Sequence, residues 1–359
     1  MKNLQFNNLF KEKFQGSRVF ITGHTGFKGS WLAYILHNLG AEVMGYALAP
    51  TKNQKNFDLL KLNSKIHHLD GNVNDREKLT KCLQSFEPEF VFHLAAQSLV
   101  LTSYEKPFET IFTNVMGSVN ILEAVRECPS VRSLVYITSD KCYENVEWVW
   151  SYRENDLLGG HDPYSASKAA AEIVFSAYLR SYFIHMPFLG AASARAGNVI
   201  GGGDWSIDRI IPDCIRSIEA KKPVFLRNPN STRPWQHVLE PLSGYLLLAS
   251  RLHDEPKKLE GAWNFGPDSK EVLTVKEVAK TLIKHIGRGE IEMASSPVQV
   301  HEASLLQLNC EKANQLLGWY PRWRIDKTIE ATAVWYKTIL DGGSAEKITL
   351  SQIKEFFTD

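Results

Sequence analysis

Apolar runs and helical periodicities alternate along residues 18–196. The runs are short and rich in β-branched and aromatic residues, as in RVFIT and EFVFHL, which is typical of buried strands. We predict strands at 18–22, 42–48, 65–69, 89–94, 133–139 and 191–196. The segments between them repeat their apolar residues at helical spacing, and we predict helices at 30–39, 75–86, 107–127 and 164–182.

Strands that alternate with helices predict a parallel sheet covered on both faces. After Asn198 proline and tryptophan become frequent, and the 359 residues exceed the roughly 250–300 of a single core. We therefore expect a Rossmann-type doubly wound sheet, with a smaller mixed α/β lobe that recognises the substrate. The sheet domain is predicted at 1–197 plus roughly 237–266, and the lobe at 198–236 and 267–359.

Charge and cysteine content narrow the function class. The net charge of +1 gives no overall field toward nucleic acid or an anionic membrane, so neither is expected as a partner. The five cysteines form no CxxC pair, which supports neither a disulfide framework nor a metal site. We find no signal peptide and no apolar run near the ~18 residues of a membrane span. A cytoplasmic protein is expected.

A glycine turn follows the first predicted strand. Gly23, Gly26 and Gly29 form G-x-x-G-x-x-G, and a helix begins inside the pattern. This context is typical of a dinucleotide site, where glycines let the backbone approach a pyrophosphate at a helix N-terminus. The position of the acid that usually holds the adenosine ribose corresponds to Tyr46, and Lys52 is near. From these residues alone, NAD and NADP both stay open.

Tyr164 and Lys168 open a later helix in the sequence PYSASK. Four residues apart, they project from one face of the helix. We expect the lysine ammonium to lower the pKa of the tyrosine and to make it a proton acceptor near neutral pH.

The glycine turn and the Y-x-x-x-K pair together resemble the extended short-chain dehydrogenase/reductase superfamily over nearly the whole chain. The resemblance implies that Tyr164 exchanges the proton of a substrate hydroxyl, that Lys168 binds the nicotinamide ribose, and that Ser139 supplies a third polar group. It implies NAD as cofactor. The residues expected to contact it are Gly23, His24, Thr25, Gly26, Phe27, Lys28, Gly29, Leu94, Ala95, Ala96, Gln97 and Thr113, with Tyr164 and Lys168.

The stretch TSDKCYEN, residues 138–145, adds an acid and a base where a buried strand ends. Sugar-nucleotide 4,6-dehydratases need this pair: after C4 is oxidised, a base removes the C5 proton and an acid protonates the C6 hydroxyl as it leaves. In the thymidine-linked branch of these enzymes the base is a glutamate. The sequence resembles the branch that acts on CDP-D-glucose, in which a lysine occupies that position. Asp140 would be the acid, and Lys141, which must be neutral when it acts, the base.

Further segments carry the same resemblance: GHTGFKGSW, YRENDLLGGHDPYSASK, RAGNVIGGGDW, RPWQHVLEPLSGYLLLA, WNFGP and HEASLLQLNCEKANQLLGW. The resemblance implies CDP-D-glucose as substrate, a role in 3,6-dideoxyhexose or related polysaccharide synthesis, and a homodimer formed through helices near 107–127 and 164–182. It places the substrate on Ser98, Asn198, Arg209, Arg233 and His301.

Alternatives stay open for single residues. Asp140–Lys141 could be a solvated turn pair, Cys142 a packed thiol or a nucleophile, and His237 a packed polar bridge or a substrate contact. Arg233 could be a surface ion pair. Trp319 and Trp323 are expected in the core.

Alternatives also stay open for the whole chain. Leu101, Asn72 and Asn309 depart from the residues expected in the branch, which bears on cofactor or substrate affinity. The rival functions are a dehydratase or 4-epimerase for another sugar nucleotide, and a non-catalytic NAD-binding regulator.

Overall fold

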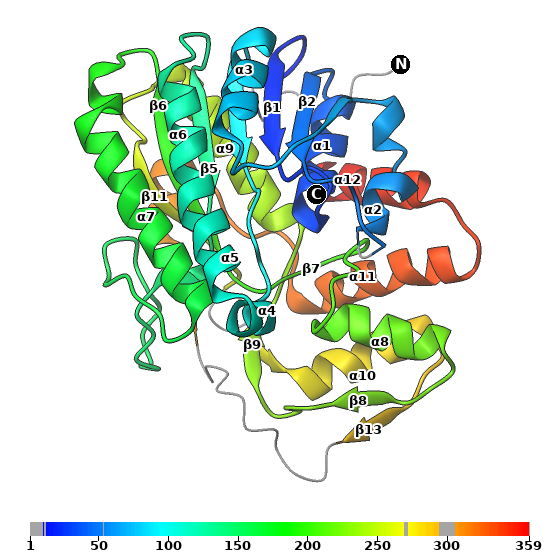
Figure 1. Ribbon diagram of the computed structural model, residues 1–359. Helices are drawn as coiled ribbons and strands as arrows, with labels where there is room; N and C mark the ends of the chain where they lie inside the picture. Colours follow the sequence, from blue (N-terminus) through cyan, green and yellow to red (C-terminus); the bar gives the residue numbers. More distant parts are fainter. Residues whose placement is uncertain (1–9, 11, 53, 269–271, 294–305, 359) are drawn as a thin grey trace.

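The computed structural model describes residues 10, 12–52, 54–268, 272–293 and 306–358. Its centre is a seven-stranded sheet whose neighbouring strands all pair in parallel (Figure 1). The strand order is β3 (His67–Asp70), β2 (Glu42–Ala47), β1 (Arg18–Thr22), β4 (Phe90–His93), β5 (Ser133–Ile137), β6 (Gly190–Ala196) and β11 (Gly261–Phe265). The order reverses between β1 and β4, which opens a crevice at the carboxyl ends of the strands.

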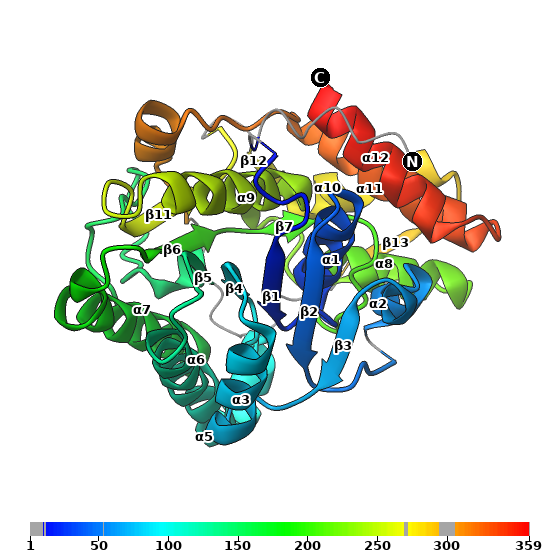
Figure 2. The same cartoon turned by 90° about the horizontal axis from the view of Figure 1, so that it is seen from above.

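Helices cover both faces of this sheet (Figure 2). One face carries α3 (Arg76–Phe86), α6 (Gly117–Arg126) and α7 (Pro163–Ser181), and the other α1 (Phe27–Asn38) and α9 (Leu239–Asp254). Every residue of β5 and β6 is buried, as a sheet with two covered faces requires. The predicted doubly wound parallel sheet is confirmed.

The helix predicted at 107–127 contains a π-helical turn. α5 (Pro107–Ile111) and α6 are joined by the π turn Phe112–Met116, and α4 (Val100–Glu105) precedes them. The π turn holds Asn114, which is buried and donates from Nδ2 to the Gln97 carbonyl at 2.9 Å and to Ser167 Oγ at 2.8 Å. Widened turns of this kind often lie beside functional sites, and this one is joined through Asn114 to α7 and to the loop after β4.

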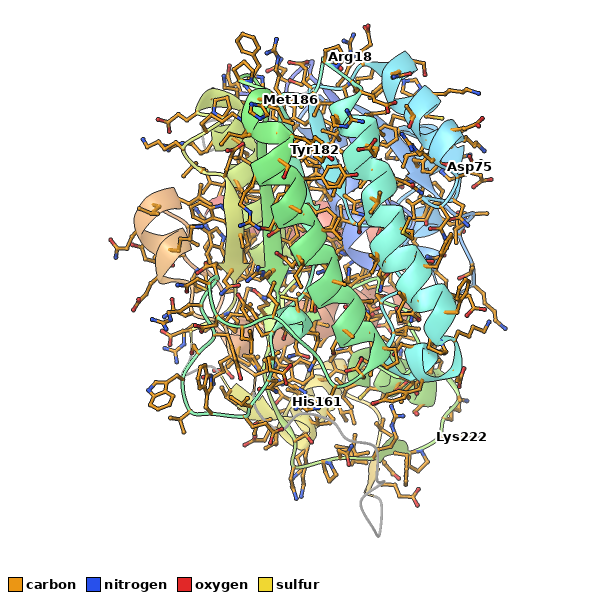
Figure 3. All side chains as sticks on the ribbon, turned by 60° about the vertical axis from the view of Figure 1, so that its left-hand side comes forward. Arg18, Asp75, His161, Tyr182, Met186 and Lys222 are labelled. Atoms are coloured by element: carbon orange, nitrogen blue, oxygen red, sulfur yellow. The ribbon has the colours of Figure 1, made fainter. Side chains whose placement is uncertain are left out.

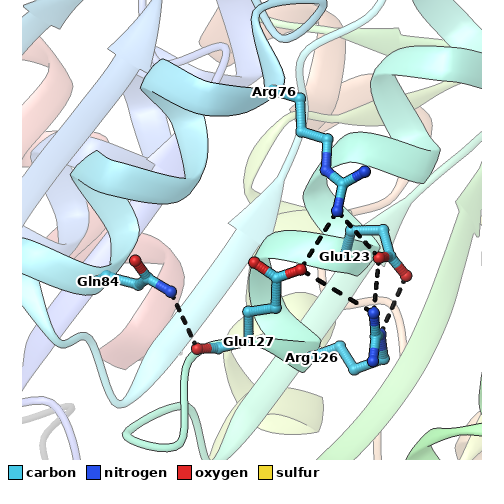
Figure 4. A network of polar contacts seen from close by, with 5 residues as sticks. All are labelled: Arg76, Gln84, Glu123, Arg126 and Glu127. Atoms are coloured by element: carbon cyan, nitrogen blue, oxygen red, sulfur yellow. Dashed lines mark hydrogen bonds and ion pairs between the residues drawn. The ribbon is translucent and has the colours of Figure 1, made fainter.

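The outer helices pack against one another, and exposed ion pairs join α3 to α6. α6 and α7 lie side by side (Figure 3). On the surface, Arg76 of α3 reaches Glu123 at 3.3 Å and Glu127 at 3.2 Å, and Arg126 lies 2.8 Å from Glu123 (Figure 4). Such exposed pairs contribute about 0–1 kcal/mol each. The layer therefore depends mainly on its buried apolar faces.

A smaller part of the molecule lies beyond the carboxyl ends of the strands (Figure 1). It contains α8 (Ile210–Glu219), α10 (Val275–Ile286) and three short strand pairs: β7 (Val199–Ile200) with β10 (Gln236–His237), β8 (Val224–Leu226) with β13 (Ile291–Met293), and β9 (Thr232–Pro234) with β12 (Val272–Thr274). The remaining helical segments are α2 (Lys55–Leu59), α11 (Ile325–Leu340), α12 (Ala345–Thr358), the 3-10 turns Leu62–Ser64, Asp140–Cys142 and Phe183–His185, and the π turn Ala313–Leu317.

One of the buried hydrophobic clusters runs through both parts. Trp31 of α1 belongs to it together with Ile215 of α8 and Leu282 of α10, and Trp319 and Trp323 belong to it as well. The prediction that these last two tryptophans are core residues is confirmed. This shared cluster does not mark where one part ends and the other begins. The predicted boundaries at residues 197 and 267 therefore stay predictions.

Candidate active site

A cavity of about 560 Å³ lies at the carboxyl ends of the strands, between the sheet and the smaller part. The glycine turn lines one side of it, and residues of α8 and β8 line the other. Asp140, Lys141 and Tyr164 face it from the end of β5 and the start of α7. This is the location that an open α/β sheet offers to ligands.

The glycine turn fits an anion. Gly23 has φ +76°, and a Cβ there would lie 2.7 Å from the Ala95 nitrogen. A Cβ on Gly26, which lines the cavity, would meet only the Gly23 carbonyl at 3.4 Å. Gly26 is the N-cap residue of α1 and provides no side-chain hydrogen bond to the helix. The first N–H groups of the helix are thus open to a negatively charged ligand, as a pyrophosphate cradle requires.

Most of the predicted cofactor contacts line the cavity, and two side chains do not. The lining residues are Gly23, Thr25, Gly26, Phe27, Lys28, Gly29, Leu94, Ala95, Ala96, Thr113, Tyr164 and Lys168. His24 points into the protein, where its Nε2 lies 2.7 Å from His68 Nδ1. Burial, with His68 as a second cause, lowers its pKa to about 3. Gln97 turns away and donates to Thr110 Oγ1 at 2.8 Å.

Tyr46 does not occupy the position predicted for it. Its ring stacks on Phe20 in the core, and its hydroxyl donates to the Asn72 carbonyl at 3.0 Å. The next residues, Ala47 and Leu48, line the cavity instead. Successive strand residues face opposite sides, so an error of one position moves a side chain from the ligand to the core. Of the three departing residues, Asn72 lines the cavity, and Leu101 and Asn309 do not.

The residues of the TSDKCYEN stretch form a tight turn at the end of β5. Ser139 Oγ accepts from the Lys141 N–H at 3.2 Å and donates to Asp140 Oδ1 at 2.9 Å. The other oxygen, Asp140 Oδ2, is buried and has no hydrogen-bond partner among the described residues. Because Asp140 is almost entirely buried, a solvated turn pair does not describe it. Asp140 and Lys141 both line the cavity.

Tyr164 and Lys168 face the same cavity from α7. Asp162 caps this helix by accepting from the Ser165 N–H at 2.9 Å. Burial raises the pKa of Tyr164 to about 12, although a hydrogen bond with Ser139 acts in the opposite direction. Burial also lowers the pKa of Lys168 to about 8. The expected lowering of the Tyr164 pKa is therefore wrong for this structure, because desolvation of the phenolate outweighs the nearby cations.

Lys28 brings a further ammonium group into the cavity. Its pKa is lowered to about 8, first by burial and then by Arg209 and Lys168, while Asp140 opposes the change. The sequence placed Lys28 only as one member of the glycine turn. The sequence signal that could have indicated a role for Lys28 in the site is a charged residue in the first turn of an otherwise buried helix.

Four of the five predicted substrate contacts line the same cavity. Ser98, Asn198, Arg209 and Arg233 line it, and His301 lies outside the described residues. Arg209 Nη1 lies 2.9 Å from Asp204 Oδ2, a carboxylate that raises the pKa of Arg209. Sequence reasoning did not single out several further lining residues: Asn56, Asp204, Asp208, Phe225, Arg227 and Trp235. Asp204 and Trp235 lie inside segments that carry the resemblance, and the other four residues have no local pattern that marks them.

Two open alternatives are decided by packing. Cys142 is fully buried, and burial raises the pKa of its thiol well above the usual value, so it is a packed residue. His237 lies among the rings of Trp31 and Trp323 and does not line the cavity.

Known proteins share this arrangement. The model of the family described as GDP-mannose 4,6 dehydratase matches residues 20–332. The chain belongs to this family. The chain is similar to the CDP-glucose 4,6-dehydratase of Salmonella typhimurium. The two sequences are 48% identical, over 92% of this chain and 94% of the relative.

Solved structures show the same fold as this family member. An epimerase from Methanothermobacter thermautotrophicus superposes with a TM-score of 0.81 at 21% identity, covering 95% of this chain and 98% of the other. The dTDP-glucose 4,6-dehydratase of Streptomyces venezuelae, solved with NAD bound, gives 0.76 at 22% identity, covering 92% and 99%. Among the described residues, no helix has the length and apolar character needed to cross a membrane.

Proposed function

We propose that this chain dehydrates CDP-D-glucose to CDP-4-dehydro-6-deoxy-D-glucose, with NAD as a cofactor that is regenerated in each cycle. The observation that carries the proposal is the joint position of Asp140 and Lys141 in the cavity that Tyr164 and Lys168 face. A dehydrogenase or a 4-epimerase needs the tyrosine and the lysine of α7. Only elimination of water needs an additional acid and base.

The glycine turn would hold the cofactor. The uncapped N-terminus of α1, together with Gly23 and Gly26, fits its pyrophosphate, while Ala95 and Thr113 line the same side. When bound there, NAD supplies the reversible hydride chemistry. Lys168 would bind the nicotinamide ribose.

Tyr164 would move the proton of the C4 hydroxyl. In this cavity the neutral phenol is favoured, because burial raises its pKa to about 12. The Arg209 guanidinium and the hydrogen bond with Ser139 act toward the phenolate. Tyr164 is therefore expected to exchange its proton only when the substrate and cofactor complete the site.

The two proton transfers of the elimination would be carried out by the two residues after Ser139. Lys141, as the unprotonated amine, takes the proton from C5, which the C4 ketone has made acidic. Asp140, as the protonated acid, gives its proton to the C6 oxygen, which leaves as water. The buried oxygen Asp140 Oδ2 has no hydrogen-bond partner among the described residues, which supports a role for this atom in contact with the substrate.

The substrate diphosphate would lie against Arg209, Arg233 and Asn198. Guanidinium groups suit phosphate oxygens because their planar forks match them. All three residues line the cavity.

We also propose a homodimer that forms through the outer helices. The apolar side chains of Phe108, Ile111, Phe112, Met116 and Ile173 are exposed on α5, the π turn and α7. Exposed large apolar side chains that gather on one part of a surface are typical of a protein interface. These side chains support the predicted dimer, and two of them, Phe108 and Phe112, stack on each other.

The decisive experiment incubates the chain and NAD separately with CDP-glucose, UDP-glucose, dTDP-glucose and GDP-mannose, and follows the products by mass spectrometry. Loss of one water from CDP-glucose alone is expected. Water loss from another donor instead would retain the elimination chemistry and change the substrate. No water loss from any donor would defeat the proposal and favour an epimerase or a non-catalytic protein.

A further inference from the structure

A buried ion pair lies directly behind the catalytic residues. Glu172 of α7 and Arg195 of β6 are 2% and 3% exposed at their side chains, and Arg195 Nη2 lies 2.7 Å from Glu172 Oε2. Neither residue lines the cavity. Two buried charges are costly unless hydrogen bonds surround them, so the partners of this pair indicate what it holds in place.

The carboxylate holds the segment before the catalytic turn. Glu172 Oε1 accepts a hydrogen bond from Thr138 Oγ1, and Thr138 directly precedes Ser139. Glu172 Oε2 also accepts from Ser193 Oγ at 2.8 Å. Glu172 stands one helical turn after Lys168, so the same stretch of α7 carries both.

The guanidinium holds the segment after the catalytic turn. Arg195 Nη1 donates to the Tyr143 hydroxyl at 2.7 Å and to the Glu154 carbonyl at 3.0 Å. The Arg195 guanidinium also lies over the Tyr143 ring, 4.9 Å from its centroid. Tyr143 follows Cys142 at the end of the turn that contains Asp140 and Lys141.

We propose that Glu172 and Arg195 form one positioning unit, which holds the segment 138–143 at both ends and sets Asp140 and Lys141 against Tyr164 and Lys168. The unit touches no substrate. It acts by fixing the end of β5 to α7 and β6, and a misplacement of about 1 Å can cost 10²-fold in rate. The inference rests on the proposed function for its rate measurements.

The charge of Glu172 also acts on Lys168. Burial lowers the pKa of Lys168, and Glu172 opposes this change most strongly. The other titratable groups that face Lys168 or Glu172 from the neighbouring elements are Lys28, His93, Tyr136, Cys142 and Arg195. Burial favours the neutral forms of His93 and Cys142, so Glu172 supplies the negative charge that keeps Lys168 protonated.

The test compares two variants with the wild type. Glu172→Gln alone leaves Arg195 buried without its partner and endangers the fold, so Glu172→Gln is combined with Arg195→Met, which removes both charges. Thr138→Val removes one hydrogen bond to Glu172 and keeps its charge. Thermal unfolding checks that both variants are folded. The Lys168 ammonium is titrated by NMR in protein with ¹⁵N-labelled lysine, assigned with Lys168→Met.

In the double variant, kcat is expected to fall about 10²-fold with a smaller change in KM, and the Lys168 titration is expected to move to lower pH. In Thr138→Val, kcat is expected to fall on the order of tenfold with the titration unmoved. A merely structural pair would not produce this split. If Thr138→Val keeps the wild-type kcat, or if the folded double variant keeps the Lys168 titration, the inference is overturned.

The two proposals fail in different ways. A wild-type chain that dehydrates no sugar nucleotide defeats the proposed function. The titration of Lys168 still decides the inference in that case, because it needs neither substrate nor cofactor. If the double variant does not fold, kcat of Thr138→Val decides it.

Discussion

At the residue scale, burial dominates the chemistry of the site. Tyr164, Lys168 and Lys28 all have pKa values displaced toward their neutral forms, and burial is the largest cause for each. Residue spacing suggested the opposite direction for Tyr164, because it shows which groups are neighbours and not how far water is excluded. The ammonium groups of Lys28 and Lys168 are therefore sensitive to pH near neutrality.

Replacement of Tyr164 by Phe tests the proton transfer directly. The variant keeps the ring and its packing and loses only the hydroxyl, so turnover should fall by at least about 10²–10⁴-fold with the unfolding temperature nearly unchanged. Product formation and thermal unfolding are measured together. Near-wild-type turnover would remove Tyr164 from the proton-transfer role. Tyr320→Phe, at an exposed position, is the matched control.

Lys141 should control the loss of the C5 proton. In Lys141→Ala, incorporation of solvent deuterium at C5 of the product should fall by about 10²-fold or more, while reduction of NAD on mixing with substrate should persist. Mass spectrometry of the product and absorbance of the reduced cofactor separate the two steps. Unchanged deuterium incorporation would count against Lys141 as the base. Lys347→Ala, on α12, serves as control.

At the element scale, a single buried carboxylate joins α9 to the segment before α11. Glu240 accepts from the Trp323 N–H at 2.7 Å and from the Arg322 N–H at 3.1 Å. It is fully buried, and burial raises its pKa to about 7, although these hydrogen bonds act in the opposite direction. The contact connects RPWQHVLEP with LGWYPRW, two segments that the sequence could not relate to each other.

The raised pKa predicts how stability changes with pH. The folded chain binds the Glu240 proton more tightly than the unfolded chain, so this contribution is complete below about pH 4.5 and is lost as pH rises to about 7. The corresponding free energy is up to about 3 kcal/mol. In Glu240→Gln, the free energy of unfolding should therefore decrease less between pH 5 and pH 8 than in the wild type.

Urea unfolding at the two pH values provides the measurement. Glu219→Gln, at the exposed end of α8, is the control and should change nothing. An equal pH dependence in Glu240→Gln and the wild type would show that Glu240 does not carry this linkage.

At the scale of the whole molecule, the two parts share one core and enclose one site. The glycine turn, the turn at residues 138–145 and the arginines come from segments up to about two hundred residues apart in the chain, and the buried cluster shared by both parts fixes their relative position. The outer face of α5 and α7 remains apolar and exposed, which bears on assembly.

A charge placed on that face should prevent dimerisation. Phe108→Glu introduces a carboxylate at a side chain that is 73% exposed, so the monomer should fold normally while burial of the charge disfavours an interface. Sedimentation velocity should show the wild type as a dimer and the variant as a monomer. Leu316→Glu alters an equally apolar, exposed residue elsewhere and should leave the dimer intact. A dimeric Phe108→Glu would place the interface on another surface.

The sequence by itself determined six of the seven strands of the sheet, their alternation with helices, and the turn at residues 138–145 that carries Asp140 and Lys141, whereas strand β11 was not predicted. Local signals suffice there: apolar runs define strands, the glycine turn marks the start of α1, and Tyr164 and Lys168 share a helix face because of their spacing. The resemblance carried by Asp140 and Lys141 indicated the reaction class before any contact was known.

Only the tertiary structure decided which side chains reach the cavity and in which charge state. His24, Gln97 and Tyr46 turn away from it, because strand parity and local hydrogen bonds determine their direction. The Glu172–Arg195 pair was missed, because its two members look like ordinary helix and strand residues until β5, β6 and α7 meet. Burial and long-range contact are properties of the folded chain, and no local pattern encodes them.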